Sequence, residues 1–350
     1  MTPPEPTLRH LHRMTDDTGL FEHAIGSLPH RSLGYCTDDA GRGLAVAVRS
    51  EEAVAEPLAE RWLSFLVQAH EGDGRFRLRM GFDRRWTEDP SSDDASGRAI
   101  FGVGVVAAVS PWPHIRREAR RLFELVSAFR SGFPRATAHA VVGAADLFIT
   151  DERCLSARSM VEDGLMSLPR GTDDEWPWPE PRLAYGNALL PEALIAAGRA
   201  LDDDVAVNEG LRLLRWLVDE ETLDGHLSFV PAAGRGPGDA RPAFDQQPIE
   251  AGALADACAR AFIVTDDEEW LEPLRLCVRW FEGMNDAGVR MFDPETGGCF
   301  DGLEAAGANQ NQGAESTIAL VATLQHDAAV EGGFVSSVTR QRAARSAASS

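Results

Sequence analysis

The sequence contains no lysine, so every one of its 34 Lys-or-Arg positions is arginine. A lysine Schiff base and the lysine of a phosphate-binding loop are therefore both excluded. The formal net charge is −21 and the sequence pI is near 4.8. This acidity argues against nucleic acid or an anionic membrane surface as a partner.

Cysteine, tyrosine and long apolar runs are scarce as well. The five cysteines show neither metal-ligand spacing nor a disulfide framework, so we expect no metal and no other cofactor. Two tyrosines and few β-branched clusters argue against a large sheet. No apolar run reaches membrane-spanning length and the N-terminus lacks a signal-peptide core, which predicts a cytoplasmic protein without a membrane partner.

Helix-forming residues are abundant and fall into two alternating patterns. Nearly all-apolar runs rich in small residues begin near positions 38, 96, 134, 185, 247 and 311. Amphipathic runs lie between them, at 51–69, 114–129, 154–168, 205–218 and 268–281. The first pattern is typical of interior helices and the second of helices with one face in water.

These runs predict an all-α fold, the (α/α)6 toroid of six inner and six outer helices. A helix over 18–25 would supply the sixth outer position. The toroid would fill residues 1–325 as one domain. The remaining 326–350 are rich in Ala, Ser, Gly and Arg without periodicity, which predicts a disordered tail.

Polar residues gather where the predicted inner helices begin. Thr37 or Asp38 is a natural N-cap, which would leave the pair Asp38–Asp39 ionised and directed outward at the positive helix end. If the inner helices run in one direction, their N-terminal ends form one cleft. The candidate binding residues of this cleft are Asp16, Asp17, Asp38, Trp86, Arg98, Trp176, Trp178, Tyr185, Asn187, Asp245, Gln246, Gln247, Asn311 and Gln312.

Amides, carboxylates and indoles together suit a polyhydroxylated, uncharged ligand, so we expect an oligosaccharide or glycoside. Any single acidic pair is more often a cap than a catalyst, and Trp176 and Trp178 could equally pack a loop. Glu250 and Glu315 differ, because a carboxylate inside a buried helix needs a partner or a cavity. His139 is interpreted as a hydrogen-bonded core residue.

Six motifs occur together on the chain: Thr15-Asp16-Asp17-Thr18-Gly19-Leu20, Gly34-Tyr35-Cys36-Thr37-Asp38-Asp39, Ser92-Asp93-Asp94, Asn187-Ala188-Leu189-Leu190-Pro191, Asp245-Gln246-Gln247-Pro248 and Asn311-Gln312-Gly313-Ala314-Glu315. Jointly, over about residues 8–325, they resemble a bacterial family of six-hairpin glycosidase-like proteins that occur alone or fused to glycosyltransferase domains. The resemblance implies an α/α toroid, a role in carbohydrate metabolism and a glycosyltransferase as a partner. The chain departs from the family pattern at Ala40, Ser96 and Gly186, where Asn, His and Asp would be expected.

The first functional hypothesis is a glycoside hydrolase, with an inverting mechanism favoured. Its two catalytic carboxyl groups would come from Asp39, Asp94, Glu250 and Glu315. Asp39 or Asp94 at a helix N-terminus is expected to stay ionised and act as base. Glu250 or Glu315, in a more apolar setting, is expected to have a raised pKa and act as acid.

Two alternatives of other classes remain open. A catalytically inactive carbohydrate-binding or scaffolding partner of a glycosyltransferase is favoured by the three departures from the family pattern. A sugar epimerase, isomerase or lyase on the same architecture ranks third, because histidine is rare at the predicted helix starts.

Overall fold

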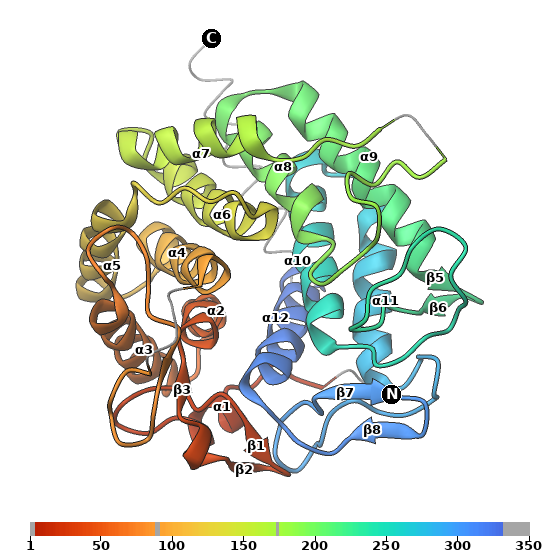
Figure 1. Cartoon of the computed structure of the whole chain (residues 1–350), viewed down its shortest axis with the longest axis horizontal. Helices are drawn as coiled ribbons and strands as arrows, with labels where there is room; N and C mark the ends of the chain where they lie inside the picture. The colour runs from red at the N-terminus through yellow and green to blue at the C-terminus, as the bar shows by residue number, and fades with distance from the viewer. Residues whose placement is uncertain (1–3, 88–91, 173–174, 332–350) are drawn as a thin grey trace.

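Twelve α-helices form two layers in residues 4–87, 92–172 and 175–331, the part of the chain that the computed structural model describes (Figure 1). The inner helices are α2 (Thr37–Val48), α4 (Asp93–Val109), α6 (Pro134–Thr150), α8 (Leu189–Leu201), α10 (Pro248–Thr265) and α12 (Ala314–Glu331). Each packs against the next, and α12 packs against α2, so the ring closes. The fold is the (α/α)6 toroid that the alternating patterns predict.

The outer helices α3 (Ala55–Ala69), α5 (Pro113–Val126), α7 (Leu155–Ser167), α9 (Asp204–Glu221) and α11 (Leu271–Glu282) pack against α2, α4, α6, α8 and α10. Their burial follows the sequence pattern. In α5 the buried residues Ile115, Ala119, Leu122 and Phe123 recur at helical spacing, with charged residues between them. In α2, by contrast, nearly every residue is buried.

The sixth outer position differs from the prediction. Residues 18–25 are not helical, because Phe21 bridges Tyr35 in extended conformation and strand β1 (Ala24–Ile25) follows at once. Strand β1 turns at Gly26, whose φ of +57° is the left-handed conformation, and pairs with β2 (Leu28–Pro29). The short helix α1 (Arg9–Arg13) packs against α12 instead.

The remaining short elements lie in the connections. Three further antiparallel pairs are β3 (Tyr35–Cys36) with β4 (Arg79–Met80), β5 (Thr222–Leu223) with β6 (His226–Leu227), and β7 (Gly302–Glu304) with β8 (Gly307–Asn309). Two 3-10 turns are η1 (Arg31–Leu33) and η2 (Glu268–Trp270). Helix α12 continues to Glu331, past the predicted start of the tail, and 332–350 lie outside the described residues. No described helix has the length and apolar character needed to cross a bilayer.

Glycines set how closely the inner helices approach. A Cβ added at Gly102 of α4 would lie 1.9 Å from the carbonyl oxygen of Gly41 in α2, and one at Gly104 would lie 2.4 Å from that of Gly143 in α6. The inner helices therefore touch backbone to backbone at these crossings. This contact is the physical reason for the small-residue runs in the sequence.

We expect Gly102→Ala to lower the unfolding free energy by about 1–3 kcal/mol, because the added methyl must push α2 and α4 apart. The better helix propensity of alanine offsets only part of this cost. Gly132→Ala is the matched control, since nothing lies within 4 Å of a Cβ there. Equal melting temperatures of the two variants would contradict the close-contact explanation.

Candidate active site

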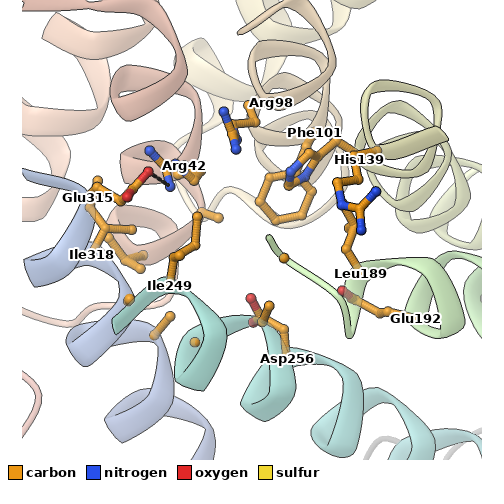
Figure 2. A pocket seen from close by; sticks show the side chains of 18 of the residues that line it. Arg42, Arg98, Phe101, His139, Leu189, Glu192, Ile249, Asp256, Glu315 and Ile318 are labelled. Carbon is orange, nitrogen blue, oxygen red and sulfur yellow. Dashed lines mark hydrogen bonds and ion pairs between the residues drawn. The ribbon is translucent and has the colours of Figure 1, made fainter. Parts of the chain in front are cut away.

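A cavity of about 70 Å³ lies on the axis of the toroid, lined by residues from all six inner helices (Figure 2). We call its three levels the mouth, the waist and the floor. The mouth consists of Arg42, Arg98, Arg135, Tyr185 and Glu315. The waist is mostly apolar and includes Val46, Phe101, His139, Leu189 and Ile318. The floor consists of Arg49, Glu192 and Asp256.

The mouth lies at the N-terminal ends of the inner helices, as the sequence predicts. Arg42 in α2 donates to Glu315 in the first turn of α12 at 2.8 Å. Arg98 in α4 donates to Asp38 in the first turn of α2 at 3.0 Å. Because these bonds join three helix starts, the starts meet at one end of the cavity.

Three carboxyl groups surround Arg42. Its Nη2 donates to Asp39 Oδ1 at 2.7 Å and lies 4.0 Å from Asp38 Oδ2, while its Nη1 donates to Glu315. We call Asp38, Asp39, Arg42, Arg98 and Glu315 the Arg42 cluster. Glu315 lines the cavity with 39% of its side chain exposed, whereas Asp39 has 3% exposed and does not itself line the cavity. The second oxygen of Asp39, Oδ2, has no hydrogen-bond partner among the described residues.

The two consecutive aspartates have pKa values shifted in opposite directions. Burial raises the pKa of Asp39 well above its usual range, and the charges of Asp38 and Glu315 add to this against the opposing effect of Arg42. Burial also opposes ionisation of Asp38, but Arg42 and Arg98 outweigh it and lower its pKa. Of the two, Asp39 therefore binds a proton more readily, and Asp38 keeps its negative charge to lower pH.

The predicted N-cap at Thr37 or Asp38 is wrong. The N-cap residue of α2 is Cys36, which makes no side-chain cap, and the Thr37 hydroxyl donates to the carbonyl of Arg77. The carboxyl groups of Asp38 and Asp39 are not directed outward, because Arg42 and Arg98 bind them within the protein. The pKa of Asp39 is also shifted upward, opposite to the direction that its place at a helix start predicts.

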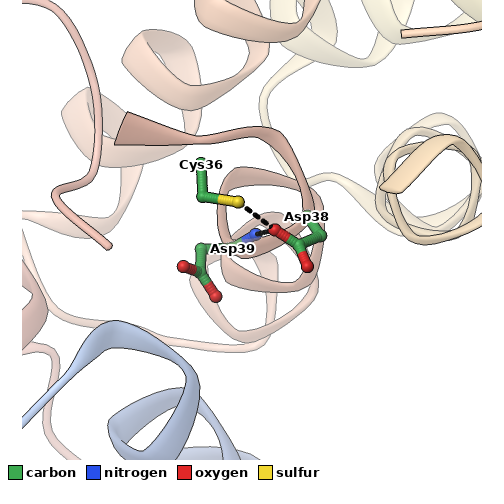
Figure 3. A group of neighbouring side chains, drawn as sticks. All are labelled: Cys36, Asp38 and Asp39. Atoms are coloured by element: carbon green, nitrogen blue, oxygen red, sulfur yellow. Dashed lines mark hydrogen bonds between the residues drawn. The ribbon is translucent and has the colours of Figure 1, made fainter. Parts of the chain in front are cut away.

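Cys36, Asp38 and Asp39 place one possible ligand atom each within 4.8 Å of one another (Figure 3). Two features disfavour a cation there. The guanidinium groups of Arg42 and Arg98 already neutralise the carboxylates. Burial and the two aspartates raise the pKa of Cys36 well above its usual range, so the sulfur is a thiol that donates to Asp38.

Asp94, Arg98 and Tyr185 form the neighbouring part of the mouth. The Tyr185 hydroxyl donates to Asp94 Oδ2, and Arg98 Nη1 lies 3.5 Å from the same oxygen. Arg135 lies 5.1 Å from the centre of the Tyr185 ring and is held by Glu180 through bonds of 2.8 and 2.9 Å. Tyr185 thus presents an aromatic ring to the cavity, while Asp94 itself does not line it.

Glu250 is buried next to the mouth but does not line the cavity. Its carboxyl group accepts from the amide of Gly186 at 2.5 Å and from the amide and side chain of Asn187 at 3.3 Å. Burial raises the pKa of Glu250 to about 7 despite these bonds, in the predicted direction. The hydrogen bonds indicate that Glu250 holds the 186–187 turn and explain why Asn187 is buried.

This pKa predicts a pH effect on stability. A carboxyl group whose folded pKa lies above its unfolded value binds more protons in the folded state, so stability is lost as pH rises from about 4.5 through 7. Wild type should lose about 3 kcal/mol relative to Glu250→Gln across this range. Chemical denaturation at a series of pH values measures the difference. Parallel curves for the two proteins would show that Glu250 does not titrate there.

The predicted tryptophans lie away from the cavity. Trp176 and Trp178 pack against Trp216 of outer helix α9, with ring centres 5.0 and 5.8 Å apart. Trp86 packs against Phe65, 5.3 Å between ring centres. All three pack a connecting loop against an outer helix, which is the alternative role that the sequence left open for Trp176 and Trp178.

The other predicted binding residues form contacts between loops. Asp16 accepts from the Tyr35 hydroxyl at 2.7 Å, and exposed Asp17 pairs with Arg84 at 2.8 Å. Asn311 accepts from the Gly26 amide, and buried Gln312 accepts from Thr296. The remaining predicted binding residues also lie outside the cavity lining; they are Asp245, Gln246 and Gln247.

The floor contains charged residues that sequence reasoning missed. Asp256 of α10 accepts from His326 of α12 at 2.5 Å, and Arg49 lies 3.5 Å away. Although burial opposes it, these two partners lower the pKa of Asp256 to about 2. No motif marked Asp256, because it lies in the middle of a helix without a polar neighbour in sequence.

Glu192 of α8 is the second carboxyl group of the floor. It accepts from Arg260 at 2.9 Å, and Arg260 also binds Asp146 of α6 at 2.9 Å. Burial and the charge of Asp256 raise the pKa of Glu192 to about 7 against the attraction of Arg260. The one sequence signal for Glu192 was a charged residue inside an apolar helix, the argument applied to Glu250 and Glu315.

No family model matches the chain, and no curated protein matches it. Among solved structures, a sugar epimerase from a ruminal bacterium has a TM-score of 0.66 at 13% identity, covering 91% of this chain and 94% of that one. Cellobiose 2-epimerase from Bacillus thermoamylovorans has a TM-score of 0.65 at 12% identity, covering 91% and 95%.

A third similar structure is an inactive variant of an α-1,6-mannanase from Salegentibacter, in complex with α-1,6-mannotriose. Its TM-score is 0.59 at 10% identity, covering 91% of this chain and 96% of that one. At such low identity these likenesses establish the toroid fold alone. What this chain does must be argued from its own cavity.

Proposed function

We propose that this chain is a carbohydrate-active enzyme, a glycoside hydrolase that binds a sugar unit at the mouth of the axial cavity. The observation that carries the proposal is Arg42 between Asp39 and Glu315. A buried carboxyl group with a raised pKa and a more exposed carboxylate accept from the two terminal nitrogens of one guanidinium. Glycoside hydrolysis requires one carboxylic acid and one carboxylate.

The proposed roles follow from protonation and exposure. Asp39 is the acid, and its unpartnered Oδ2 donates a proton to the leaving glycosidic oxygen. Glu315, the more exposed group, is the base that takes a proton from water as the water attacks the anomeric carbon. Arg42 stabilises both groups when ionised. These roles reverse the sequence-based assignment of Asp39 as base and Glu315 as acid.

An uncharged sugar suits the mouth better than an anion. Asp38, Asp94 and Glu315 lie beside Arg42 and Arg98, so the cationic groups are already paired with carboxyl groups. The ring of Tyr185 can cover the C–H face of a sugar. The Salegentibacter mannanase adds support, because its inactive variant is substituted at two consecutive aspartates, and this chain has such pairs at the starts of α2 and α4.

The test is product release from a panel of α- and β-linked oligosaccharides that includes cellobiose and α-1,6-mannotriose. We expect new reducing ends from at least one member, and the inverted anomer as first product by NMR. Absence of turnover together with calorimetric binding would instead support an inactive carbohydrate-binding protein. A pull-down with a glycosyltransferase would then test the partner that the sequence resemblance implies.

A sugar epimerase or isomerase is the second candidate, favoured by the inner cavity. Glu192 and Asp256 line the floor with pKa values of about 7 and about 2, and His139 lies above them. Carboxyl groups with such separated values can divide acid and base roles. Deuterium uptake from D2O into mannose or glucose, with a new epimer or isomer, would support this reaction over hydrolysis.

A further inference from the structure

His139 is the polar side chain of the waist. It lies one turn below Arg135 in α6, and its ring centre is 6.0 Å from that of Phe101 (Figure 2). Its other surroundings in the cavity are aliphatic and include Val46, Leu189 and Ile318. Part of its surface is accessible, and that surface faces the cavity.

His139 has no hydrogen-bond partner among the described residues. The core histidines behave differently: His10 bonds to the Gln312 carbonyl at 2.8 Å, and His326 bonds to Asp256. The interpretation of His139 as a hydrogen-bonded core residue is therefore wrong. A polar group left unpaired in an apolar environment costs stability, so its presence needs another explanation.

The imidazole is neutral. Burial lowers the pKa of His139 well below its usual range, and the charges of Arg98 and Arg42 lower it further. A neutral imidazole has one ring nitrogen that donates and one that accepts a hydrogen bond. Neither function is used by a described residue, and Arg98 and Arg42 of the mouth are near enough to lower the pKa of the ring.

We propose that His139 is a specificity residue whose ring hydrogen-bonds a hydroxyl of the sugar unit held in the waist. The aliphatic walls then pack against the C–H faces of the same sugar, and the mouth binds the remainder of the ligand. This inference rests on the proposed carbohydrate site, and it adds that one sugar unit passes beyond the mouth. It does not depend on whether the reaction is hydrolysis or isomerisation.

The first arm of the test is binding. Calorimetry with mannose, glucose, cellobiose and α-1,6-mannotriose identifies a ligand of the wild type, and monodeoxy analogues of that ligand follow. We expect His139→Phe to bind the parent sugar about 2- to 10-fold more weakly than wild type does, which is the effect of losing one neutral hydrogen bond. One deoxy analogue should bind the wild type weaker than the parent sugar does, by the same factor. On His139→Phe, that analogue and the parent sugar should bind with equal affinity. His139→Gln should recover part of the affinity.

The second arm is thermal stability without ligand. Because the His139 side chain has no hydrogen bond to any residue that the structure describes, His139→Phe and the smaller His139→Leu should melt at the wild-type temperature or up to about 3 °C higher. His114→Phe on outer helix α5, where His114 is exposed, is the matched control for binding. It should leave every affinity unchanged.

The two arms separate the possible failures. If His139→Phe binds the parent sugar as tightly as wild type does, the inference is overturned while the carbohydrate site stands. If the wild type binds no sugar of the panel, the proposed function fails. Whatever the binding result, a melting temperature lowered by several degrees in both His139→Phe and His139→Leu would show that His139 has a structural role and would overturn the inference.

Discussion

Asp39→Asn is expected to reduce glycoside turnover by about 10²- to 10⁴-fold while leaving the fold intact, because it removes the proposed general acid. Asparagine keeps the shape of the side chain, and its amide oxygen can still accept from Arg42 Nη2. Wild-type turnover should fall as pH rises past the raised pKa of Asp39, since only the protonated acid is competent. Initial rates across pH on the best glycoside of the panel measure both effects.

Glu315→Gln should cause a loss of similar size through the base. The matched control for Asp39→Asn is Asp17→Asn, because Asp17 is also the second aspartate of an Asp-Asp pair. Asp17 is exposed and pairs only with Arg84 on the described surface, so its variant should keep wild-type turnover. Full activity of Asp39→Asn would remove Asp39 from the mechanism, and equal losses in Asp17→Asn would point to a non-specific effect.

Arg42→Gln has the second large expected effect, on stability. It leaves Asp39 and its neighbours buried beside one another without the guanidinium that binds them. Removal of one partner of a buried ion pair typically costs about 3–5 kcal/mol, and we expect a loss of that size at pH 8. The remaining carboxyl groups would then have raised folded pKa values, so the loss should be smaller near pH 5, where they can be protonated.

Two controls accompany this variant in denaturant unfolding at pH 5 and pH 8. The double variant Asp39→Asn/Arg42→Gln should recover part of the stability at pH 8, because one buried carboxyl group is gone. Arg84→Gln breaks only the exposed pair with Asp17 and should change stability by less than about 1 kcal/mol. A pH-independent loss in Arg42→Gln would contradict the proposed charge balance of the cluster.

The fold could be predicted because its cause is local in sequence. Interior helices with runs of small residues and outer helices with one apolar face differ in periodicity, and the ring follows from their alternation. Glycines such as Gly41 and Gly102 appear in the sequence as part of those runs. The prediction of a helix over 18–25 is wrong because Phe21 in this segment pairs with Tyr35 as extended chain, despite the short apolar pattern.

The site could be located but not resolved in detail. Three acidic pairs look alike in sequence, yet Asp16–Asp17 joins surface loops, Asp38–Asp39 lies in the Arg42 cluster, and Asp94 binds Tyr185. What separates them is the partner that the fold brings to each from a distant segment: Tyr35 to Asp16, Arg98 to Asp38 and Tyr185 to Asp94. Pairings such as Arg42 with Glu315, 273 positions apart, follow from the closure of the ring.

Residues inside the helices were the hardest to predict. The roles of His139 and Asp256 depend on which side of an interior helix faces the axis, and an all-apolar helix has no polar face to mark that side. The tryptophans show the opposite error, because they were predicted to bind the ligand and lie away from the cavity. Trp178 looks like a sugar platform in sequence, but Trp216 of an outer helix covers it.

The most direct test of the carbohydrate site is a crystal structure of Glu315→Gln grown with the tightest-binding oligosaccharide of the panel. We predict a sugar unit within the axial cavity, beside Arg42 and Tyr185 at the mouth and with a hydroxyl on His139 in the waist. Sugar bound only outside the cavity, for example at the loop around Trp176, with the Arg42 cluster untouched, would contradict the proposed site.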